Sequence, residues 1–70
     1  MNEQSMLEIL SQRPFQPFEI ELSSGQRLSI RHPENVMLTR SRIVIVNPEK
    51  DSVAVTSLLH ITSVRYFHAA

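Results

Sequence analysis

The chain has 70 residues, no cysteine, and seven lysines plus arginines against seven aspartates plus glutamates. A chain of this length makes one marginally stable domain, so we expect a single domain over residues 1–70 that tends to form homo-oligomers. The lack of cysteine excludes a disulfide framework and a thiolate metal site. The balanced charge excludes a bulk attraction to nucleic acid or to an anionic membrane, so any charge-driven binding must be local.

The N-terminal ten residues contain two glutamates and no basic residue, unlike a signal or transit peptide. No apolar run approaches the roughly 20 residues that a membrane span requires. We therefore expect a soluble, cytoplasmic protein that makes no membrane contact.

A short helix is predicted at the N-terminus. Ser5 and Glu8 have the spacing of a capping box, and Asn2 is a second possible N-cap one turn earlier. The helix should end near Gln12, because Pro14 disfavours helical geometry in the residue before it and cannot donate a backbone hydrogen bond. The apolar residues of this predicted helix are Met6, Leu7, Ile9 and Leu10.

Apolar and polar residues alternate over residues 18–22 and again over residues 27–31, which predicts two half-buried antiparallel strands. A two-residue loop between them would put the apolar faces on opposite sides, so we predict a three-residue loop, Ser-Ser-Gly at 23–25. Gly25 should then have a positive φ. The predicted pairs are Phe18 with Ile30, Ile20 with Leu28, and Glu21 with Arg27. Before the first strand, Phe15 should pack beneath the sheet.

Three further apolar runs are short and either β-branched or flanked by turn residues, which favours strands at 36–38, 43–46 and 53–55. Pro33 must lie at a bend or an edge, and residues 47–52 read as an exposed hairpin loop. The apolar residues from 58 to 67 strictly follow neither the periodicity of a helix nor that of a strand. We favour a strand with a bulge near Thr62 and Ser63, and a helical turn over residues 57–60 is the alternative.

These elements predict a mainly β fold, in which a short helix precedes a five- to six-stranded antiparallel sheet or a small barrel. Residues 43–46 have no polar alternation, so both faces of this strand should be covered. The core would cover one face. Either the N-terminal helix or a second subunit would cover the other, and the sequence does not choose between them.

The hairpin at residues 20–28 and the segment at 59–64 resemble those of the Sm-like small barrels, which include the bacterial RNA chaperone Hfq. The resemblance implies a ring oligomer that binds single-stranded RNA. It also implies that His60 matches the family's histidine before the last strand, although Leu59 stands where that family has a basic residue.

A second set of motifs is similar to those of a group of short uncharacterised bacterial proteins, a group that implies a fold and no activity. These motifs are Arg-Pro-Phe-Gln-Pro-Phe at 13–18, Ser-Gly at 24–25, Arg-His-Pro-Glu at 31–34 and Leu-Leu-His-Ile at 58–61.

Six residues are candidates for a nucleic-acid site, because arginine can donate two hydrogen bonds to one phosphate group and histidine can add another donor. They are Arg27, Arg31, His32, Arg40, Arg42 and His60. The competing interpretation is that these side chains lie in solvated turns, and that residues 31–34 tie neighbouring strands together.

We expect no metal and no cofactor, since His32, His60 and His68 lack the spacing of a zinc site. We also expect no enzyme, because the chain has no glycine-rich phosphate loop, no cysteine and no serine in an elbow motif.

Two hypotheses remain. The first is a small β interaction module that self-associates and binds another protein, with a sheet edge as a candidate binding surface. The second is an Sm-like barrel that binds single-stranded RNA through an arginine patch, which the net charge disfavours. The sequence identifies neither the biological process, nor the partner, nor the size of the oligomer.

Overall fold

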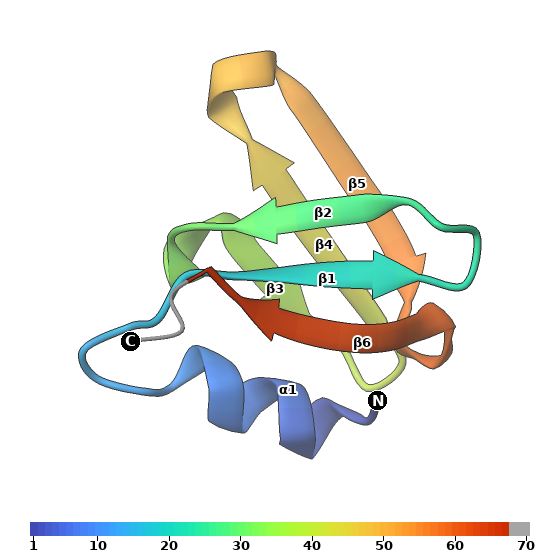
Figure 1. The fold of residues 1–70 in the computed structure, drawn as a ribbon, viewed down its shortest axis with the longest axis horizontal. Helices are drawn as coiled ribbons and strands as arrows, with labels where there is room; N and C mark the ends of the chain where they lie inside the picture. The colour runs from blue at the N-terminus through green and yellow to red at the C-terminus, as the bar shows by residue number, and fades with distance from the viewer. Residues whose placement is uncertain (68–70) are drawn as a thin grey trace.

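The computed structural model describes residues 1–67 and shows one α-helix followed by six strands in two three-stranded antiparallel sheets (Figure 1). The helix is α1 (Glu3–Leu10). The first sheet contains β2 (Arg27–Ile30), β1 (Phe18–Leu22) and β6 (Ile61–Tyr66) in that order, and the second contains β3 (Val36–Leu38), β4 (Arg42–Asn47) and β5 (Ser52–Ser57). The predicted fold class is confirmed. Within residues 1–67 no strand pairs with a strand of the other sheet, so the arrangement is not a closed barrel.

Helix α1 begins one turn earlier than a cap at Ser5 would place it. The side chain of Asn2 accepts a hydrogen bond from the backbone N–H of Ser5 at 2.8 Å, so Asn2 is the N-cap and the Ser5–Glu8 capping box is wrong. The extended backbone of Asn2 suits a cap, and Glu3 then lies in the first turn, where a negative charge is favourable. The helix ends at Leu10, two residues before Gln12.

The β1–β2 hairpin has the predicted register, with Phe18 opposite Ile30, Ile20 opposite Leu28 and Glu21 opposite Arg27. Its three-residue loop is closed by two backbone hydrogen bonds of 2.8 Å, from Leu22 N–H to Gln26 C=O and from Gly25 N–H to Leu22 C=O. Gly25 has φ +92°, as predicted. The odd loop therefore keeps the apolar side chains of both strands on the core side.

Gly25→Ala is expected to lower the free energy of unfolding by about 1–2 kcal/mol, the cost of left-handed backbone for a residue with a Cβ. A Cβ at this position would meet no atom within 4 Å, so the loss would come from the backbone alone. Urea denaturation followed by circular dichroism measures it, with Ser23→Ala in the same loop as the control. Equal midpoints for the two variants would contradict the expectation.

Three short 3₁₀ turns connect the remaining elements. Pro33 begins η1 (Pro33–Asn35) at the bend between the two sheets, as predicted. The exposed loop between β4 and β5 contains η2 (Pro48–Lys50), where the Asn47 side chain accepts from the Lys50 N–H at 3.3 Å. Both turns start with proline, which is already set for the first position of a helix.

The third turn, η3 (Leu58–His60), precedes β6. The alternative of a helical turn is therefore correct for residues 58–60, and a strand over these residues is wrong. The Ser57 hydroxyl accepts from the Leu59 N–H at 3.2 Å, and Leu58 is buried, which together stabilise the turn. The predicted bulge is confirmed, because Glu21 lies opposite Ser63 and Leu22 opposite Ile61, leaving Thr62 as the extra residue.

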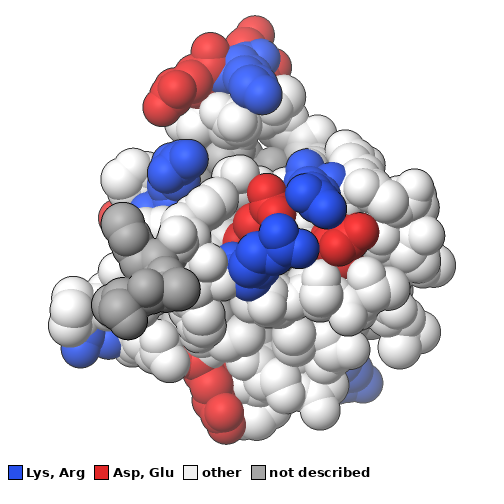
Figure 2. All heavy atoms as spheres, in the orientation of Figure 1, with Lys and Arg blue, Asp and Glu red and all other residues white. Residues whose placement is uncertain are grey.

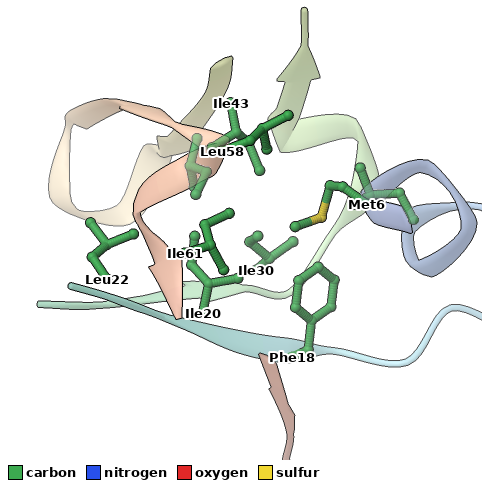
Figure 3. Close-up of a cluster of buried hydrophobic side chains, with 10 residues drawn as sticks. Met6, Phe18, Ile20, Leu22, Ile30, Ile43, Leu58 and Ile61 are labelled. Atoms are coloured by element: carbon green, nitrogen blue, oxygen red, sulfur yellow. The ribbon is translucent and has the colours of Figure 1, made fainter. Parts of the chain in front are cut away.

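The core lies between the two sheets and is closed at one side by α1. Figure 3 shows Met6 of the helix pointing toward side chains of both sheets, among them Phe18. The Phe18 ring lies 6.0 Å from that of Phe15 and 6.3 Å from that of Tyr66. Phe15 is partly buried against this cluster, as predicted. The buried residues are Met6, Leu10, Phe18, Ile20, Leu22, Ile30, Ile43, Ile45, Leu58 and Ile61.

Candidate functional site

The outer face of the first sheet is polar. Side chains alternate along a strand, so the residues between the core-facing positions of β1, β2 and β6 point away from the core. They are Glu19, Glu21, Arg27, Ser29, Ser63 and Arg65. Figure 2 shows acidic and basic side chains next to one another on this side of the molecule. The face is therefore charge-balanced and suited to water.

The outer face of the second sheet is apolar. Met37, Val44 and Val55 lie opposite one another across β3, β4 and β5, and Val46 lies opposite Val53. We call these five residues the apolar face. Met37, Val53 and Val55 have 66%, 65% and 60% of their surface exposed, values more typical of charged side chains.

The helix does not cover the apolar face. Its buried residues, Met6 and Leu10, belong to the core between the sheets, while Val53 and Val55 stay exposed. Of the two alternatives for the second face of residues 43–46, cover by the helix is therefore wrong. An eight-residue helix has one apolar stripe, and here that stripe closes the core. Coverage by a second subunit stays a prediction.

A groove separates β2 from the far end of the β4–β5 hairpin. It consists of two adjoining hollows of about 470 and 280 Å³ that share the residues Ser29, Ile45, Asn47 and Lys50. Figure 1 shows the end of the hairpin that carries η2 extending past β2. The inner surface of that hairpin therefore forms one wall of the groove, and β2 forms the other.

The structure distributes the six nucleic-acid candidates over several elements. Arg27 lies in β2 opposite Glu21. Arg31 follows β2, and its guanidinium carbon lies 4.8 Å from the centre of the Phe67 ring. The adjacent His32 has its Nδ1 atom 3.8 Å from a carboxylate oxygen of Glu34. Arg31 and His32 both line the groove.

The other three candidates lie elsewhere. Arg40 lies in the turn between β3 and β4, Arg42 begins β4, and His60 ends the turn η3. These two turns are neighbours, because the N–H of Leu58 donates to the C=O of Ser41 at 2.9 Å. Figure 1 places the β3–β4 turn far from the end of β2. The structure thus groups Arg31 with His32, and Arg40 and Arg42 with His60, but does not gather the six on one surface.

Neither a metal site nor a membrane-spanning helix is found in the part of the chain that the structure describes. No three histidine or carboxylate side chains among residues 1–67 lie close enough to hold a metal ion. His68 lies outside these residues. The same residues contain no helix that is long and apolar enough to cross a membrane.

Comparison of the chain with protein-family models, with curated proteins and with solved structures finds no match. The candidate sites are therefore supported by the geometry of this structure alone.

Sequence reasoning missed the groove and only partly found the apolar face. The unbroken run at residues 43–46 indicated a strand covered on both sides, but Met37 and Val53 joined that face only once the register was known. The groove exists because β6 pairs with β1 and leaves β2 at an edge. No local pattern reports that strand order.

Proposed function

We propose that this chain is a small β interaction module that self-associates through the apolar face and binds another protein. The observation that carries the proposal is the difference between the two outer faces. One sheet follows the usual antiparallel pattern, with a polar side toward water. The other has apolar residues on both sides.

A second copy of the chain suits the apolar face because its five residues carry no charge, and the one charged residue on the same side of β3, β4 and β5, Arg42, lies at the end of β4. In a two-fold dimer the same patch meets itself, so any charge on it would meet a like charge and lose water. Five uncharged side chains, four of them valine, avoid both costs. Two such sheets can pack face to face about 10 Å apart, as they do in β-sandwiches.

The ends of the sheet favour an antiparallel arrangement of the two copies. Arg40 lies in the β3–β4 turn and Arg42 begins β4, whereas the loop at the other end of β4 carries Glu49 and Asp51 together with Lys50. Turning the second copy end for end would bring the basic turn of each near the more acidic loop of the other. This arrangement adds electrostatic attraction at the rim of the interface. Such attraction raises the rate of association more than it raises the affinity.

The dimensions of the face set the expected affinity. β4 and β5 have six residues each and β3 has three, so the patch is at most about 20 Å along the strands and about 14 Å across them. A stable interface buries about 800 Å² on each partner, out of 4970 Å² of accessible surface on this chain. The apolar face is only the centre of such an interface, so we expect a reversible dimer with a dissociation constant of micromolar order.

Val55→Glu is expected to weaken the dimer by about a hundredfold or more, since it buries a carboxylate on each side of the two-fold axis. Light scattering coupled to size exclusion, over a range of about 10 µM to 1 mM, measures the change. Leu59→Glu is the matched control, because Leu59 is 84% exposed and lies in η3, outside the apolar face. A wild-type chain that stays monomeric throughout, or equal effects of the two variants, would refute self-association through this face.

RNA binding through a basic patch is the second hypothesis, without the closed barrel that the Sm-like resemblance implies. The group formed by Arg40, Arg42 and His60 is the observation that favours it. Retention of single-stranded RNA that falls steeply as salt rises would support it. Nuclease-treated and untreated pull-downs test both hypotheses in one experiment.

A further inference from the structure

The free edge of β2 presents unpaired backbone groups to the groove. In an antiparallel pair, opposite residues alternate between hydrogen-bonded and non-bonded. The bond from Leu22 N–H to Gln26 C=O marks that pair as bonded. By alternation Leu28 and Ile30 also bond to β1, whereas the N–H and C=O groups of Arg27 and Ser29 point the other way. No strand among residues 1–67 pairs with that edge.

The groove beside this edge has a mixed lining, in which polar residues surround a few apolar ones. Ile45 and Ala54 line it from the inner surface of the β4–β5 hairpin, opposite to the side that carries the apolar face. Ile30 contributes from the end of β2. A strand lying here could therefore bury every second side chain and hydrogen-bond to β2 along its length.

The charges along the groove are mainly positive. Arg27, Arg31 and Lys50 line it together with a single carboxylate, that of Glu49. Arg27 lies on the side of β2 directed away from the core, and Arg31 directly follows the end of this strand. A partner strand would thus have its outward side chains next to arginines and its inward side chains over Ile45 and Ala54.

We propose that this groove binds an extended segment of another protein, in which acidic and small apolar residues alternate, as an added strand on β2. The proposal deepens the proposed function, since it rests on the chain binding another protein, but it does not depend on self-association. The glutamates of the segment pair with the arginines beside β2, and its valine-sized residues fill the groove. Its backbone satisfies the free groups of Arg27 and Ser29.

Fluorescence anisotropy with a labelled, end-capped peptide Glu-Val-Glu-Val-Glu-Val tests the proposal. We expect saturable binding that weakens as salt rises, and at least about tenfold weaker binding of Lys-Val-Lys-Val-Lys-Val. Equal binding of the two peptides would overturn the acidic preference. An absence of saturable binding by either would overturn the site.

Backbone methylation distinguishes strand addition from simple charge attraction. Only alternate N–H groups of an added strand face β2. N-methylation of the three glutamates and N-methylation of the three valines should therefore give unequal losses, with one peptide about tenfold weaker than the other. Equal affinity of the two methylated peptides would show that no strand is added.

Lys50→Glu reverses a charge inside the groove and is expected to weaken the acidic peptide at least about fivefold. Arg40→Glu is the matched control, because it makes the same change in the β3–β4 turn, outside the groove. Equal losses in both variants would mean that net charge, and not this groove, holds the peptide. Displacement of the bound peptide by oligouridine at the same site would point to RNA and overturn the assignment.

Val55→Glu separates this proposal from self-association. Val55 lies on the face of β5 opposite to the groove, so the variant should be monomeric and bind the peptide as the wild type does. Loss of the dimer with retained peptide binding supports both proposals. A wild-type dimer without peptide binding refutes the groove alone, and peptide binding by a wild-type monomer refutes self-association alone.

Discussion

Phe18→Ala is expected to lower the free energy of unfolding by about 3–5 kcal/mol, the usual cost of deleting a buried aromatic ring. Phe18 has none of its surface exposed. Its ring contacts the segment before β1 through Phe15 and the end of β6 through Tyr66. A domain of this size rarely has more than about 3–5 kcal/mol of stability. The variant should therefore be largely unfolded at room temperature, which circular dichroism and amide proton dispersion would show.

Two variants make that experiment specific. Phe18→Leu keeps most of the buried volume and should lose less than half as much stability. Phe15→Ala removes the same ring from a partly buried position, so its loss should also be smaller. Equal losses of stability from Phe15→Ala and Phe18→Ala would contradict the structure, because they would mean that Phe15 is buried as deeply as Phe18.

The β1–β2 hairpin could be predicted to the residue because local rules suffice for it. The alternation at Phe18, Ile20 and Leu22 defines the buried side, and the requirement that Leu28 share that side leaves an odd loop. Gly25 is the residue that can close such a loop with a positive φ. Every constraint lies within thirteen residues, so no long-range information is needed.

The sequence offered two candidate caps for the helix, and only the structure shows that Asn2 is the one used. Asn2 and Ser5 are both good N-caps, and their preferences differ by only a few tenths of a kcal/mol. The position of Met6 and Leu10 in the core decides how α1 is placed, and that choice belongs to tertiary packing. The hydrophobic pattern at residues 58–67 was ambiguous because a 3₁₀ turn is followed there directly by a strand with a bulge.

The two candidate binding surfaces depend on strand order, which the sequence does not report locally. An edge strand and a central strand can have the same alternation, so β2 shows no sign in its residues that one side is free. The apolar face needed the register of three strands. The run at residues 43–46 did indicate apolar residues on both sides of β4, but cover of its outer side stays a prediction.

Met6→Ala has the second-largest expected effect, a loss of about 2–5 kcal/mol. An eight-residue helix is not stable alone in water, so α1 is held by its buried side chains. Met6 is fully buried and Leu10 nearly so. Met6→Leu keeps the volume and should cost less than about 1.5 kcal/mol. Leu7→Ala, at an exposed position of the same helix, is the second control.

The stability of Met6→Ala at different protein concentrations also tests the proposed self-association. If folded chains pair through the apolar face, mass action adds stability as the protein concentration rises, by up to about 1.4 kcal/mol for each tenfold increase. Met6→Ala should therefore be largely unfolded at about 10 µM and partly refold near 1 mM. Adding Val55→Glu should remove that recovery without altering the core, since Val55 lies outside it. An unfolding midpoint of Met6→Ala that does not move with concentration would show that the apolar face adds nothing to the stability of the folded chain.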